Sequence, residues 1–145
     1  MVDTSIGTTW GISATLPATY DALGYGALTL LTVGEITAIP QNGPTTEVVK
    51  HTPLVDGITQ KFHGATDYGS ITIPLGISRA DTGQVALRAA QISRDRVAFG
   101  TTFPDGTVVF KCGKVMSFTT GAEVGGIVNG EVLVEYETAE VTVAP

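Results

Sequence analysis

The hydrophobic period of the sequence changes within residues 68–94, and this change limits the folds that the chain can adopt. Ile71, Ile73 and Leu75 alternate with small or polar residues, so every second side chain there is apolar. Because successive side chains of a strand point to opposite faces, this alternation predicts a half-buried β-strand. Directly after it the apolar spacing becomes helical, which predicts a strand followed at once by a helix.

The helical spacing covers about residues 81–94, and it is the one convincing long helix in the sequence. Asp81 followed three residues later by Gln84 matches a capping box, whose side chains bond free backbone N–H groups of the first turn. One helix among many strands is expected to cover the end or open face of a sheet. We assign its apolar face to Val85, Ala86, Ala89, Ala90 and Ile92.

The rest of the chain is rich in strand-forming residues. Val, Ile and Thr make up about a third of the sequence, and β-branched residues favour strands. Pro104-Asp105-Gly106 is a tight-turn signal, and it predicts a hairpin between strands on either side. The sequence therefore predicts a mainly β fold, a sandwich or barrel of about seven to nine strands with one flanking helix.

The chain is expected to form one domain over residues 1–145. Residues 1–28 show weak patterns and are interpreted as an extended N-terminal arm. Residues 40–57 show little regular pattern apart from a short strand candidate at 45–50. A loop of that length in a compact domain is usually functional or mobile, and we interpret it as an assembly loop. Trp10 in the arm has two interpretations: it packs on its own domain, or the arm docks it on a neighbouring copy.

Charge points to assembly and away from nucleic-acid binding. Charged residues are 15% of the chain, and the formal net charge is −6. An acidic chain without a basic stripe has nothing to neutralise phosphates. A chain with so few charges is expected to hide much of its surface between copies.

No set of residues predicts catalysis or metal binding. His51 and His63 lack a third ligand at short spacing, so we interpret them as surface residues. Asp67 and Asp81 flank one strand but have no aromatic platform for a sugar. Cys112 is the only cysteine and lies on an apolar strand face, which favours a buried, inert thiol.

We expect no enzyme activity, no cofactor, no secretory signal and no membrane span, and so a soluble protein made in a reducing compartment.

Seven short segments follow one another in an order that is more specific than any one of them. They are residues 7–25 (GTTWGISATLPATYDALGY), 33–40 (VGEITAIP), 51–57 (HTPLVDG), 61–75 (KFHGATDYGSITIPL), 80–90 (ADTGQVALRAA), 104–107 (PDGT) and 114–119 (KVMSFT). In this order the chain resembles the major tail tube proteins of long-tailed, siphovirus-like bacteriophages, which are related in fold to type VI secretion tube proteins.

The resemblance implies a structural virion protein of the phage tail, assembled in the cytoplasm of the host bacterium. Six copies would close a ring, and rings would stack into a hollow tube. The tape-measure protein would fill the tube, and DNA would later pass through it without specific binding. Tail terminator and baseplate or distal tail proteins are the other implied partners. Many relatives carry an extra C-terminal immunoglobulin-like domain, which we do not expect within residues 1–145.

Two alternatives remain open at this point. The chain is a related tail component, such as a tail terminator or baseplate hub protein, or a secretion tube protein. Alternatively it is an unrelated carbohydrate- or ligand-binding β-sandwich, which the absence of an aromatic cluster disfavours.

The tail tube resemblance also implies surfaces between copies and a lumen. The residues assigned to contacts between subunits are Trp10, Tyr20, Gln41, Asn42, Pro44, Leu54, Asp56, Arg88 and Arg94. The residues assigned to the lumen are Asp67, Glu131 and Glu135. An acidic lumen would repel phosphates, so DNA would slide instead of binding.

Overall fold

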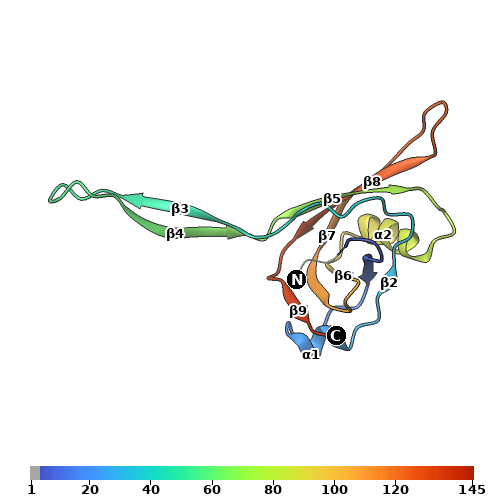
Figure 1. The fold of residues 1–145 in the computed structure, drawn as a ribbon, viewed down its shortest axis with the longest axis horizontal. Helices are drawn as coiled ribbons and strands as arrows, with labels where there is room; N and C mark the ends of the chain where they lie inside the picture. The colour runs from blue at the N-terminus through green and yellow to red at the C-terminus, as the bar shows by residue number, and fades with distance from the viewer. Residues whose placement is uncertain (1–3) are drawn as a thin grey trace.

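The computed structural model describes residues 4–145, and within them it holds nine strands and two helices (Figure 1). In chain order these are β1 (Thr9–Ser13), α1 (Ala22–Gly26), β2 (Leu31–Thr32), β3 (Thr45–His51), β4 (Gln60–Asp67), β5 (Ser70–Gly76), α2 (Thr82–Ser93), β6 (Val97–Thr102), β7 (Val108–Gly121), β8 (Asn129–Tyr136) and β9 (Val141–Val143). The prediction of a mainly β fold with one flanking helix is confirmed, with α1 as a short addition.

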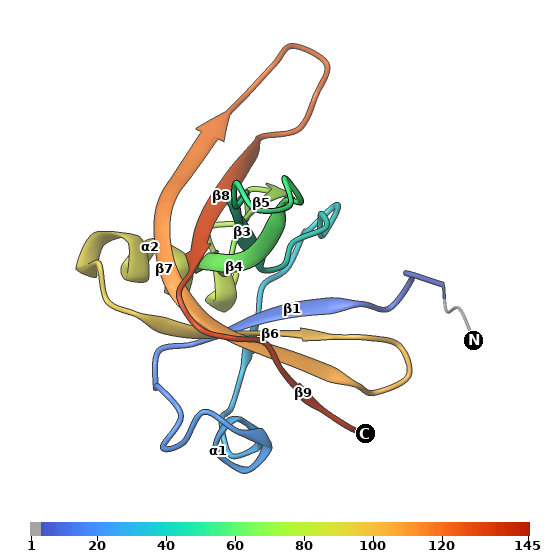
Figure 2. The ribbon, with the colours of Figure 1, turned by 90° about the vertical axis from the view of Figure 1, so that its left-hand side faces the viewer.

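Seven strands form one antiparallel sheet in the order β2-β1-β6-β7-β8-β5, with β9 also paired to β7. The long strand β7 holds the sheet together: its first half pairs with β6 and β9, and its second half pairs with β8. Figure 2 shows β7 curving between these two parts of the sheet. The sheet ends at β2 and β5, so it is not a closed barrel.

The main core lies against the inner face of this sheet, under α2. Trp10 and Phe99 stack there with ring centroids 5.1 Å apart, and Tyr136 meets Phe99 edge-on. A second, smaller core joins Tyr25 of α1 to Phe110 of β7. Burial of these large aromatic rings provides much of the hydrophobic stabilisation of the body.

The assignment of the apolar face of α2 was right for Ala90, which is buried, and for Ala86, which packs against the core, but wrong for the other three residues. Val85 and Ile92 are 52% and 76% exposed, while Leu87 is fully buried. Gly83 is on the same face as Leu87 and rests on the backbone of β2, where a Cβ atom would lie 2.4 Å from the Thr32 carbonyl oxygen. Only a glycine allows this close approach, so the Gly83 and Leu87 face must point inward.

The capping box is half confirmed. The Asp81 carboxylate accepts a hydrogen bond from the Gln84 N–H at 3.0 Å. The Gln84 side chain does not return to Asp81. Its Oε1 accepts from the Ser78 N–H, and its Nε2 donates to the carbonyls of Gly34 and Gly76. Gln84 therefore ties α2 to the two loops beside it.

Two segments differ from the sequence-based expectation. Within the predicted N-terminal arm, residues 9–13 form β1, which lies inside the sheet between β2 and β6. Residues 1–3 of that arm lie outside the described residues. Within the predicted loop at 40–57, the strand candidate at 45–50 is confirmed as β3, which pairs with β4 in a separate two-stranded sheet. The long hairpin that the two strands form was not predicted.

Candidate assembly surfaces

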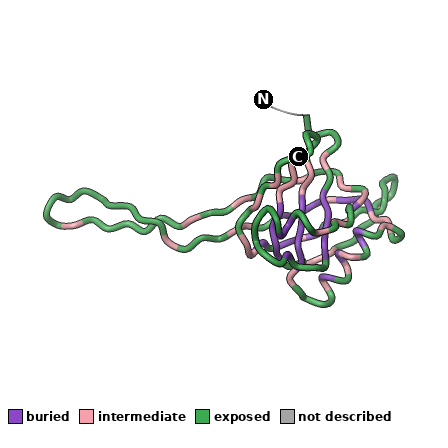
Figure 3. The backbone as a smooth tube through the Cα atoms, turned by 90° about the horizontal axis from the view of Figure 1, so that it is seen from below, coloured by how far each residue is buried: buried purple, intermediate pink, exposed green. Residues whose placement is uncertain are grey.

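The β3–β4 hairpin, residues 45–67, projects far from the body and is called the ribbon below (Figures 1 and 3). None of its residues is buried. At its tip, Leu54 and Val55 are 102% and 97% exposed. A two-stranded ribbon is marginal in water by itself, so this geometry calls for a partner outside the protomer.

The ribbon has two different faces. On one face Val49 pairs with Phe62, and the Val49 and Glu47 side chains lie over Gly64; we call this the apolar face. On the other face Lys50 pairs with Lys61, and His63 pairs with Val48; we call this the lysine face. Like charges directly opposite each other weaken a strand pair, but exposed lysines also protect a ribbon from random aggregation.

The root of the ribbon is fixed by close backbone contact. Gly69 has a φ of +88°, and a Cβ atom there would lie 2.5 Å from the Gly43 carbonyl oxygen. The Asp67 carboxylate accepts a hydrogen bond from the Gly69 N–H at 2.9 Å. These contacts set the direction in which the ribbon leaves the body.

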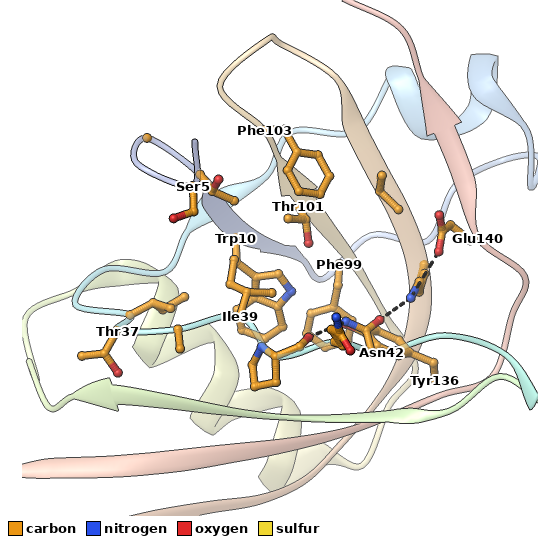
Figure 4. A pocket seen from close by; sticks show the side chains of 18 of the residues that line it. Ser5, Trp10, Thr37, Ile39, Asn42, Phe99, Thr101, Phe103, Tyr136 and Glu140 are labelled. Atoms are coloured by element: carbon orange, nitrogen blue, oxygen red, sulfur yellow. Dashed lines mark hydrogen bonds and ion pairs between the residues drawn. The ribbon is translucent and has the colours of Figure 1, made fainter. Parts of the chain in front are cut away.

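A cavity of about 1080 Å³ lies beside this root, and Figure 4 shows Trp10, Phe99, Asn42 and Glu140 around it. Lys111 of β7 is buried at its wall. Its Nζ donates to the Asn42 side-chain oxygen, lies 3.5 Å from the Glu140 carboxylate and 4.7 Å from the centroid of the Tyr136 ring. A buried ammonium group needs such partners, and through Asn42 it holds the segment that leads into β3.

The predicted contact residues fall into separate places. Gln41 and Asn42 line the cavity, and Pro44 directly precedes β3. Leu54 and Asp56 lie in the tip of the ribbon, where Asp56 accepts a hydrogen bond from the Ile58 N–H. The structure therefore gathers these five residues at the root and the tip of one element.

Trp10 is corrected. Its side chain is 1% exposed and stacks on Phe99 inside its own protomer, so it is not on a surface that a second copy contacts. Tyr20 is about half exposed and packs edge-on against Tyr25.

Arg88 and Arg94 lie on α2 and at its end. The Arg88 guanidinium lies 4.2 Å from the centroid of the Phe118 ring and 3.5 Å from the Thr120 hydroxyl, so it contacts its own protomer. Arg94 is exposed and caps α2 in the left-handed conformation, with its N–H bonded to the Ala90 carbonyl. Contacts of either arginine with a neighbouring copy stay predictions.

An exposed apolar stripe on α2 was missed by sequence reasoning. It consists of Val85, Ala89 and Ile92, which all point away from the core. The signal was present in the sequence, because Gly83, Leu87 and Ala90 share a helical face that combines one large apolar side chain with two small residues.

Glu131 and Glu135 lie together on the solvent face of β8, opposite the buried Val132 and Val134. Asp67 is not with them, because it ends β4 in the ribbon sheet. The structure thus brings two of the three predicted lumen residues to one sheet face.

Glu137 and Cys112 contact neighbouring side chains within the body. Glu137 of the β8–β9 segment contacts the Arg96 guanidinium at 2.6 Å and the Lys114 ammonium at 3.5 Å. The hydrogen bond from Arg96 lowers the pKa of the Glu137 carboxyl. Burial raises the pKa of the Cys112 thiol, which lies 3.2 Å from the Tyr25 hydroxyl, as expected for an inert cysteine.

Within residues 4–145, no group of three or more His, Cys, Asp or Glu side chains is placed to hold a metal ion. Neither helix in this part of the chain is long and apolar enough to cross a membrane.

No protein-family model matches the sequence, and a search of curated proteins gave no match. Solved structures do match over most of the chain. A chain in the tail of an empty gene transfer agent particle, refined with C6 symmetry, has a TM-score of 0.67 and 21% identity, and the match covers 83% of this chain and 90% of that one.

Two further structures extend this likeness. The SPP1 tail tube has a TM-score of 0.63 and 15% identity, with 95% of this chain and 77% of that chain covered. A sheath/tube terminator of an extracellular contractile injection system has a TM-score of 0.68 and 10% identity, with 99% and 98% covered. The fold of this chain is therefore the fold found in tail tubes and in injection-system tube components.

Proposed function

We propose that this chain is the structural subunit of a bacteriophage tail tube, in which six copies close a ring and rings stack into a hollow tube. The observation that carries the proposal is the ribbon: a long two-stranded arm, with no buried residue, on a body that has the tail tube fold. Such an arm needs a partner, and a second copy of the same chain supplies one at every position along a tube.

The C6 symmetry of the similar gene transfer agent tail supports a ring of six. The ends of the seven-stranded sheet at β2 and β5 also favour ring closure. Residues 35–37 bond to the last part of the outer edge of β5, from Pro74 to Gly76, so the first part of that edge and the edge at β2 can pair between neighbours. A closed ring would protect these edges from uncontrolled aggregation.

The proposal places the solvent face of β8 toward the lumen. Glu131 and Glu135 would make the wall acidic, and passing DNA would be repelled from it. The tape-measure protein, a tail terminator and baseplate or distal tail proteins are the further partners. The subunit would belong to the virion, assemble in the bacterial cytoplasm and carry no enzyme activity of its own.

Negative-stain electron microscopy of the purified protein tests this function. Long hollow tubes with six-fold symmetry in end views are the expected result. A monodisperse monomer at high protein concentration, with no polymer under any salt condition, would contradict it.

A second candidate is a related tube component such as a terminator, a baseplate hub or a secretion tube protein. The likeness to the sheath/tube terminator over almost the whole chain favours it specifically. The same micrographs separate the two, because a terminator is expected to form discrete single rings that do not stack.

A further inference from the structure

The exposed stripe on α2 needs an explanation. Val85, Ala89 and Ile92 recur at helical spacing, span about 10 Å along the helix and point away from the core. Single exposed apolar residues are ordinary, but a regular apolar stripe on a helix is typical of a surface that packs on another element.

The ribbon carries a matching surface. Val49 and Phe62 are paired across its apolar face, and both are about half exposed. Gly64 on the same face has no side chain, and the Val49 side chain packs over it, so that a Cβ atom there would lie 2.9 Å from the Val49 Cγ2 atom.

The two surfaces do not meet within one protomer. Figure 1 shows the ribbon leaving one end of the long axis of the molecule, while α2 lies on the other side of the body. Surfaces at opposite ends of a subunit meet when copies follow each other head to tail, which is an open, repeating contact.

Charge decides which face of the ribbon fits α2. Arg88 is the only charged residue of α2 and borders the stripe. The lysine face would bring Lys50 and Lys61 against it, which is unfavourable. The apolar face carries Glu47 beside Val49, which is favourable.

We propose that the apolar face of the ribbon of one copy packs on the Val85–Ala89–Ile92 stripe of a copy in the next ring. This inference rests on the proposed function, since it names the surfaces through which rings stack. The lysine face then remains in solvent, where Lys50 and Lys61 keep the ribbon from pairing at random.

Cysteine cross-linking in assembled tubes tests the contact. The double variant Val49→Cys/Ala89→Cys is treated with a short bifunctional maleimide and run on a denaturing gel. Because every copy carries both cysteines, a contact between rings links copies into a ladder that continues beyond hexamers. Cys112 is fully buried, so the wild-type tubes are expected to give no ladder.

Two matched variants control the result. Lys50→Cys/Ala89→Cys places the ribbon cysteine on the lysine face, next to Val49, and is expected to give no ladder. Val49→Cys/Val124→Cys tests the exposed loop between β7 and β8 as the receiving surface instead, and it is also expected to give none. Val49→Cys/Val85→Cys is a second pair on the proposed contact, for use if Ala89→Cys impairs assembly.

The proposal is overturned if tubes form but the ladder comes from either control variant, stops at hexamers, or is absent for both stripe pairs. Wild-type protein that forms no tubes at all would instead contradict the proposed function, and the inference with it.

As an independent test, Ile92→Glu is expected to abolish tubes while the melting temperature of the monomer stays unchanged. Tubes of normal length from Ile92→Glu would also overturn the contact.

Discussion

Single residues in this chain show that a local sequence pattern predicts a local role, such as a helix cap, more easily than the place of a side chain in the tertiary structure. Asp81 was predicted as a helix cap and is one, because capping depends on residues three positions apart. Trp10 had two interpretations of equal standing, and only the tertiary structure places it against Phe99. Its partner is distant in sequence, so no local pattern distinguishes the two.

Gln84 provides a test of the buried hydrogen bonds around α2. Replacing it with Leu removes the side-chain partners of the Ser78 N–H and the carbonyls of Gly34 and Gly76. The bond to Gly76 is buried and the other two are partly buried. Because an unpaired buried polar group costs about 1–3 kcal/mol and a partly buried one costs less, we expect the free energy of unfolding to fall by about 2–3 kcal/mol. Urea denaturation of the monomer measures it. Gln91→Leu on the same helix, with its side chain only partly buried, is the control and is expected to change stability little.

Glu137 predicts a pH dependence. Arg96 holds its pKa below the ordinary value of 4.5 in the folded state, so the folded state favours the ionised form. The stability that the ionised Glu137 carboxylate contributes is therefore present at neutral pH and is lost as the pH falls through its pKa in the folded state. Denaturant unfolding of wild type and Glu137→Gln over pH 3–7 measures it. The two proteins should differ most near neutrality and converge in acid, and a constant difference would contradict the assignment.

At the scale of elements, the strands were predicted better than their pairing. The alternation in residues 70–76 and the turn at 104–106 located β5 and the β6–β7 hairpin. The ribbon was only half recognised, because β3 follows Asn42-Gly43-Pro44, a turn signal, and its partner β4 begins beyond a second loop. Pairing across that loop depends on register, which no single strand specifies.

Removing the ribbon separates folding from assembly. Replacing residues 47–65 by Asn-Gly joins Thr46 and Thr66, which are already paired, through a two-residue turn. No buried side chain is lost, so we expect a monomer with a melting temperature close to that of wild type. Tubes should be absent in electron micrographs. Normal tubes from this variant would mean that the ribbon is not a contact between rings.

At the scale of the whole molecule, composition predicted that the chain assembles but not which surfaces meet. The low charge content predicted that neighbouring copies cover much of the surface. The open sheet ends and the exposed ribbon agree with this prediction. The stripe on α2 escaped prediction because the inward face of a helix depends on what it packs against, here the backbone of β2 at Gly83.

The acidic face of β8 can be tested in the assembled state. Glu131→Lys combined with Glu135→Gln should leave monomer stability and tube formation unchanged, because both side chains are exposed and outside the proposed contacts, and no lysine is placed opposite Lys114 of β7. The variant tubes should bind a short single-stranded oligonucleotide, with an affinity that falls as salt rises, while wild-type tubes should not. Fluorescence anisotropy measures this. Loss of tubes with a stable monomer would place these residues in a contact between copies instead of the lumen.

The fixed root of the ribbon has a mechanical consequence. A ribbon strand of seven or eight residues is a lever of about 25 Å, so a rotation of about 5° at the root moves its far end by about 2 Å. When a tube bends, the spacing between rings opens on the convex side and closes on the concave side. A root held by Gly43, Gly69 and the Lys111–Asn42 bond resists this rotation. The curvature that such a tail tolerates is then set at the base of each ribbon, while its apolar face stays in contact with the next ring.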